Sequence, residues 1–98
     1  MNIQYTNKIK KIKFRANYRG TKESDNLIGN FVTIILKQKN KINLTIINDL
    51  EIFLNITDLE LMNWILHNIP PRESKNISEN FKLLFLSYIN TINDKKNL

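Results

Sequence analysis

The segment NYRGTKESDNLIGNF, residues Asn17–Phe31, holds both glycines of the chain, Gly20 and Gly29. Glycine adopts a positive φ without steric cost and often follows the last turn of a helix, so Gly20 predicts a corner between two helices. Thr21 comes next, and a threonine side-chain oxygen can cap the N-terminus of the following helix. Capping alone leaves open whether Arg19–Glu23 only connects two helices or also forms a contact surface.

Helical spacing of apolar residues extends from this corner in both directions. It predicts one helix over about residues 6–18 and a second over about residues 22–38. Gly29 lies inside the second helix, where glycine costs about 1 kcal/mol relative to alanine. We therefore expect a neighbouring helix to approach closely at Gly29.

Three more helices are predicted after the polar connector KQKNK. Thr45 is the expected N-cap of the third. Thr57 and Glu60 have the spacing of a capping box, in which each side chain bonds the other residue's backbone N–H, and the fourth helix ends before Pro70. The fifth begins near residue 77, and the last residues, NDKKNL, are expected to fray. The prediction is an all-α, small five-helix bundle: a single domain over residues 1–98, with an ordered core over about 6–92 and frayed termini.

The apolar residues at helical spacing form the predicted core, which includes the single tryptophan. These residues are Tyr5, Ile9, Ile12, Ala16, Leu27, Ile28, Phe31, Val32, Ile34, Ile35, Ile46, Ile47, Leu50, Phe53, Leu54, Leu61, Trp64, Ile65, Phe81, Leu84, Phe85 and Tyr88.

Composition excludes several classes of function. The chain has no cysteine, so it has neither disulfides nor a thiolate metal site. It has no apolar run long enough to span a membrane and no apolar secretory signal at its start. Its one histidine, His67, falls late in the fourth predicted helix, without partners at catalytic or metal-ligand spacing, and is expected at the surface. These features predict a protein that is not an enzyme.

The net charge of +6 permits an anionic partner but does not identify one. Lys8, Lys11, Arg15 and Arg19 share one side of the first predicted helix, and we call them the basic stripe. Such a stripe is most often a solvated face. It is also compatible with docking to an anion-rich partner, so a small basic helical nucleic-acid-binding protein is the alternative function.

The five residues Arg19–Glu23, called here the signature turn, have two interpretations of their own. In the first they are an ordinary helical connection, in which an Arg19–Glu23 surface pair contributes only about 0–1 kcal/mol. In the second they form a binding patch. Gly20 lets another backbone approach, Arg19 offers a planar charged fork, and Glu23 supplies an acceptor one turn away.

The signature turn and a second block, DLELMNWIL, resemble the FAD assembly factors of succinate dehydrogenase, the bacterial SdhE and mitochondrial assembly factor 2 family. The matching positions are Arg19, Gly20, Glu23, Asp25, Leu27, Ile28, Gly29 and Phe31, then Asp58, Leu61, Asn63, Trp64 and Ile65. The resemblance covers about residues 8–92 and implies a five-helix bundle, as the periodicity does. Tyr18 departs from the pattern, because the family often has a basic residue there. The short basic tail departs too.

The resemblance implies a factor that binds the flavoprotein subunit of succinate dehydrogenase, or of fumarate reductase, and promotes covalent attachment of FAD to that subunit. FAD would be held by the partner, and no cofactor is expected on this chain. Carried over by position, the implied partner-binding residues are Arg19, Gly20 and Glu23, with Thr21, Lys22, Arg15 and Lys11 beside them. The implied setting is a monomer in the bacterial cytoplasm, or in the mitochondrial matrix of a eukaryote, with no nucleic acid and no membrane insertion.

Overall fold

The computed structural model describes residues 3–38 and 43–96, and the side chains of residues 6–38 and 43–92. Over these ranges the chain forms five α-helices and one 3₁₀-helix, which confirms the predicted all-α bundle. The helices are α1 (Ile3–Asn17), α2 (Lys22–Lys37), α3 (Leu44–Asn55), α4 (Asp58–His67), the 3₁₀-helix η2 (Arg72–Asn76) and α5 (Glu79–Lys96).

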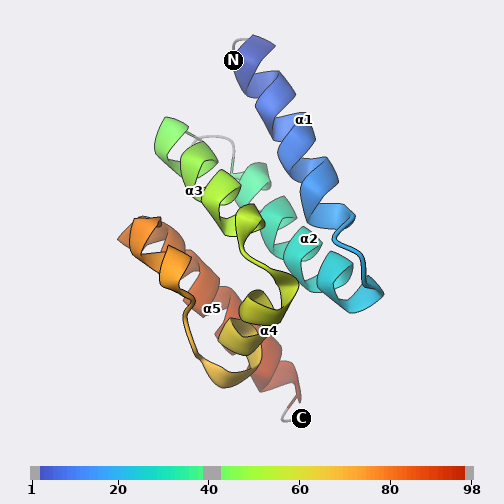
Figure 1. Ribbon diagram of the computed structural model, residues 1–98, viewed down its shortest axis with the longest axis vertical. Helices are drawn as coiled ribbons and strands as arrows, with labels where there is room; N and C mark the ends of the chain where they lie inside the picture. The colour runs from blue at the N-terminus through green and yellow to red at the C-terminus, as the bar shows by residue number, and fades with distance from the viewer. Residues whose placement is uncertain (1–2, 39–42, 97–98) are drawn as a thin grey trace.

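The helices are arranged around α2 (Figure 1). Helix α1 packs against both α2 and α3. Helix α5 lies on the side of α2 opposite α1, and α4 crosses near the end of α3 (Figure 1). The corner between α1 and α2 therefore lies at an edge of the bundle, close to the junction between α3 and α4 (Figure 1).

An aromatic cluster in the core joins four of the helices. The ring centroid of Phe31 on α2 lies 5.4 Å from that of Phe53 on α3, and 5.5 and 4.9 Å from those of Phe81 and Phe85 on α5. Trp64 on α4 packs edge-on against Phe85 at 4.7 Å, which confirms its predicted place in the core. These tilted and edge-on contacts are the geometries that aromatic pairs prefer.

Ile34 was predicted to face the core, and it is 48% exposed. The buried stripe of α2 is Ile28, Phe31, Val32 and Ile35, an i, i+3, i+4, i+7 series. Ile34 lies beside this stripe and faces the gap between α2 and α5. Tyr5 was also predicted in the core, but its side chain lies outside the described residues.

The predicted cap of α3 was wrong by two residues. The side chain of Asn43, not Thr45, caps the helix, and its Oδ1 accepts from the backbone N–H of Ile46 at 2.9 Å. Asparagine caps helices at least as well as threonine, so the earlier residue takes the role.

The predicted capping box of α4 forms only in part. Thr57 Oγ1 accepts from the backbone N–H of Glu60 at 3.2 Å. No reciprocal bond from Glu60 is present among the described residues. Its carboxyl lies near Glu73 of η2, and desolvation and then the Glu73 charge raise the pKa of Glu60.

A buried carboxylate fixes the start of α5, and the sequence analysis missed it. Asp49 on α3 is 3% exposed and accepts from both the backbone N–H and the hydroxyl of Ser78, at 3.0 and 2.5 Å. The Ser78 hydroxyl in turn accepts from the N–H of Phe81.

Helix α5 then continues to Lys96, so most of the segment predicted to fray is helical. Asn97 and Leu98 lie outside the described residues. None of the described helices is long and apolar enough to span a membrane.

Gly29 confirms the predicted close approach of a neighbouring helix. A Cβ at this position would lie 2.5 Å from Oδ1 of Asn17 and 3.5 Å from the carbonyl oxygen of Ala16, both at the end of α1. The end of α1 therefore packs directly onto the backbone of α2.

Replacing Phe31 with alanine is expected to lower the free energy of unfolding by about 3–5 kcal/mol, because it empties the centre of the aromatic cluster. The measurement is urea denaturation followed by circular dichroism. Ile34→Ala on the same helix is the control, and about 0.5 kcal/mol or less is expected for an exposed site. Equal losses for the two variants would contradict the described core.

The effect of a substitution at Gly29 on stability is expected to depend on the size of the new side chain. Gly29→Ala needs only the Asn17 side chain to move and gains about 1 kcal/mol of helix propensity, so its net effect should be small. Gly29→Leu must displace the α1 backbone, with an expected loss of about 1–3 kcal/mol. Thermal unfolding of both variants measures the difference, and equal melting temperatures would rule out the close approach.

Candidate partner-binding surface

The signature turn begins two residues after α1 ends at Asn17, and hydrogen bonds hold its backbone at both ends. Gly20 has φ +114°, a value that side chains of L-residues rarely allow, which confirms the predicted conformational role of glycine. Thr21 Oγ1 accepts from the N–H of Ser24 at 3.1 Å and so caps α2 as predicted. Asp25 Oδ1 accepts from the backbone N–H of Arg19 at 2.6 Å. These contacts hold the turn in one conformation.

The side chain of Arg19 is directed into the protein and is only 8% exposed. Its Nε donates to Oδ1 of Asp58 at 2.5 Å. Its Nη1 donates to the carbonyl oxygen of Leu54 at 3.0 Å, and its Nη2 donates to that of Ile56 at 2.5 Å. We call this set of bonds the Arg19 network. It joins the signature turn to the junction between α3 and α4. The sequence analysis had instead placed the Arg19 guanidinium at the surface beside Glu23.

Gly20, Thr21, Lys22 and Glu23 are the exposed part of the turn. A Cβ built on Gly20 would meet no atom within 4 Å, so the space beside it is open. Within the described part of the chain, the side chains of Lys22 and Glu23 make no hydrogen bond or ion pair. The turn thus combines a rigid backbone with one cationic and one anionic group that face solvent.

The basic stripe is divided between contacts inside the chain and solvent. Lys8 Nζ lies 3.9 Å from a carboxylate oxygen of Glu51, and Arg15 Nη2 donates to Oδ1 of Asn55 at 2.6 Å. With Arg19 and Asp58, these pairs follow the contact of α1 with α3 and the start of α4. Lys11 is exposed.

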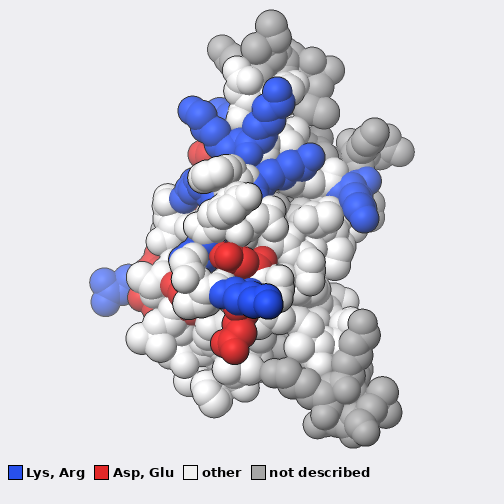
Figure 2. Space-filling model, turned by 90° about the vertical axis from the view of Figure 1, so that its right-hand side faces the viewer, with Lys and Arg blue, Asp and Glu red and all other residues white. Residues whose placement is uncertain are grey.

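Figure 2 shows Lys and Arg side chains gathered over the upper part of one face, with acidic and basic groups adjacent below them. Lys8 and Arg19 of the stripe pair with carboxylates on other helices. The stripe is therefore not a row of four unpaired cations that could follow phosphates. This weakens the nucleic-acid alternative.

Two exposed aromatic residues precede the turn, and the sequence analysis did not identify them as a surface pair. Phe14 and Tyr18 on and just after α1 are 64% and 70% exposed, and their rings stack with centroids 4.6 Å apart. Their i, i+4 spacing could have indicated a side-chain pair, but both residues lie outside the buried apolar stripe of Ile12 and Ala16. They add apolar area next to the signature turn.

Elsewhere the described residues offer little reactive chemistry. His67 is exposed at the end of α4, as expected. No group of three or more His, Asp or Glu side chains among them is placed to hold a metal ion.

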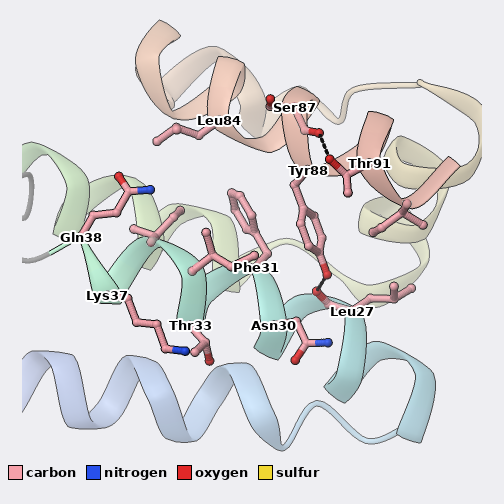
Figure 3. A pocket seen from close by; sticks show the side chains of 13 residues that line it. Leu27, Asn30, Phe31, Thr33, Lys37, Gln38, Leu84, Ser87, Tyr88 and Thr91 are labelled. Atoms are coloured by element: carbon pink, nitrogen blue, oxygen red, sulfur yellow. Dashed lines mark hydrogen bonds between the residues drawn. The ribbon is translucent and has the colours of Figure 1, made fainter. Parts of the chain in front are cut away.

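A groove of about 650 Å³ lies between α2 and α5 (Figure 3). Tyr88 crosses it to donate to the Leu27 carbonyl at 2.6 Å, and Lys37 is the one charged residue among the described residues that line it.

Comparison with known proteins identifies the family. The family model for Sdh5, described as the flavinator of succinate dehydrogenase, matches residues 10–85. A curated relative, the FAD assembly factor SdhE of Acetobacter pasteurianus, is 41% identical over 66 residues. That match covers 67% of this chain and 58% of the relative's length. No solved structure matches significantly. The chain therefore belongs to the Sdh5 family of succinate dehydrogenase flavinators.

Proposed function

We propose that this protein is an assembly factor that binds the flavoprotein subunit of succinate dehydrogenase and promotes covalent attachment of FAD to it. Membership of the Sdh5 family supports the proposal, as does the similarity to the FAD assembly factor SdhE of Acetobacter pasteurianus. The contact surface is the exposed part of the signature turn, Gly20, Thr21, Lys22 and Glu23, while the inward side chain of Arg19 lies behind it. Arg15 and Lys11 of the basic stripe flank it.

The observation that carries this proposal is the combination of a hydrogen-bonded backbone and exposed residues at the signature turn. A surface that is already in one conformation loses little conformational entropy when a partner binds. Gly20 leaves open space for an approaching backbone, and Lys22 and Glu23 present opposite charges in the first turn of α2. Such a patch suits a partner surface that also carries both charges.

The proposed mechanism is a shift of the partner's conformational equilibrium. The factor binds the arrangement of the flavoprotein in which its own residues attach FAD, and this preference raises the population of that arrangement. The factor itself supplies no catalytic group. It acts as a monomer in the bacterial cytoplasm, and the flavoprotein of fumarate reductase is the alternative partner.

Glu23→Ala is expected to reduce covalent flavin in the co-expressed flavoprotein strongly, while the factor stays folded. The matched control is Glu79→Ala, because Glu79 is also an exposed glutamate in the first turn of a helix. Both substitutions remove a helix-dipole interaction of about 0.3–1 kcal/mol, and Glu79→Ala also removes an ion pair with Lys82, so a larger loss of covalent flavin for Glu23→Ala reports on the surface. The measurement is in-gel flavin fluorescence of the denatured flavoprotein.

Gly20→Val tests the same surface through the backbone, because a side chain at φ +114° strains the turn even though space is open. Loss of covalent flavin with an intact helical circular dichroism spectrum is expected. Normal flavinylation with both Glu23→Ala and Gly20→Val would show that the signature turn is not the contact surface. Normal flavinylation in the absence of the factor would show that the function itself is wrong.

A further inference from the structure

Arg19 has the residue type expected for a direct contact with a partner, but its geometry is that of an internal anchor. Each of the three guanidinium nitrogens donates to an oxygen of the same chain, two of them backbone carbonyls and one a carboxylate. Only 8% of the side chain is exposed. A partner carboxylate has little access to this group while these bonds persist.

The three acceptors of Arg19 lie 35 to 39 residues away along the chain, across the junction of α3 and α4. Leu54 is at the end of α3, Ile56 follows α3, and Asp58 is the first residue of α4. Carbonyl groups at the end of a helix lack intrahelical partners. Arg19 satisfies two carbonyls in this region and places a positive charge beside Asp58, which is 30% exposed.

The backbone of the same residue is held from the other side. The N–H of Arg19 donates to Asp25 in the first turn of α2, and Thr21 caps that helix. Arg19 is therefore fixed to α2 through its backbone and to the α3–α4 junction through its side chain. The orientation of Gly20–Glu23 relative to α4 depends on this double attachment.

We propose that Arg19 is a positioning residue, which holds Gly20–Glu23 in the binding orientation through Asp58 and does not itself contact the flavoprotein. This inference rests on the proposed function. It gives a physical link between the two sequence blocks that identify the chain, because Arg19 belongs to the first block and Asp58 to the second. The two blocks then form one surface held by one ion pair.

A double-mutant cycle separates this role from a direct contact. The variants are Arg19→Ala, Asp58→Ala and the combination, and the readout is the Kd of the full chain for the flavoprotein. If Arg19 acts through Asp58, both single variants should weaken binding, by about 10- to 100-fold for a lost charged hydrogen bond, and the double variant should be no weaker than Arg19→Ala alone.

Thr57→Ala is the control for general loosening of α4. It removes the N-cap bond to Glu60, next to Asp58, without touching any partner of Arg19. Binding by this variant should stay close to wild type, even though helix α4 loses about 1 kcal/mol. Wild-type affinity for Asp58→Ala with lost affinity for Arg19→Ala would overturn the proposal in favour of direct contact. Equal weakening by Thr57→Ala and Asp58→Ala would overturn it in favour of a merely structural role. If the unmodified chain does not bind the flavoprotein, the proposed function fails instead.

A second measurement needs no substitution. The Nε–H proton of Arg19, bonded to Asp58, should give a slowly exchanging NMR signal in the free protein. If Arg19 only positions the turn, this proton should keep its protection from exchange when the flavoprotein is added. Loss of protection, or a new bonding partner in the complex, would contradict the proposal.

Discussion

The guanidinium of Arg19 is the contact on which the arrangement of the surface depends. A nearly buried charged group must be paired and hydrogen-bonded, because removing one partner leaves an uncompensated charge away from water. Arg19 meets this requirement with the carboxylate of Asp58 and the carbonyls of Leu54 and Ile56. The requirement fixes the corner between α1 and α2 relative to the start of α4. Local helix formation alone would not fix it.

The two glycines support this corner in different ways. Gly20 supplies the positive φ that turns the chain directly after Arg19. Gly29 lets the end of α1, at Ala16 and Asn17, lie against the backbone of α2. The first glycine sets the conformation of the turn and the second sets the distance between the helices that it connects. Neither role depends on a side chain, so any side chain strains the backbone at Gly20, whereas Gly29 excludes only side chains larger than alanine.

Local sequence patterns predicted most of the fold. The helices of the described residues follow apolar periodicity, and the caps Thr21 and Thr57 were recognised because each lies directly before its helix. Ile34 was misplaced because periodicity does not say how wide the buried stripe of a helix is. The 3₁₀-helix η2 was missed because its segment RESKN has no apolar period.

The candidate surface was predictable only in part. The residues of the signature turn were identified from the chain, and the exposure of Lys22 and Glu23 agrees with the expectation for a contact surface. The inward direction of Arg19 was not predictable, because its partner Asp58 is 39 residues away and no local spacing relates them. The Asp49–Ser78 contact was missed for the same reason, at a separation of 29 residues. Tertiary pairing of polar side chains leaves no periodic signal in the sequence.

The binding surface is located most directly by following the backbone amide NMR signals of the isotope-labelled chain as unlabelled flavoprotein is added. If the signature turn is the contact surface, signals of Gly20, Lys22 and Glu23 should shift or broaden first. Signals from the groove between α2 and α5, such as those of Thr33 and Thr91, should stay unchanged until later in the titration. Early changes in the groove with none in the signature turn would show that the flavoprotein binds elsewhere.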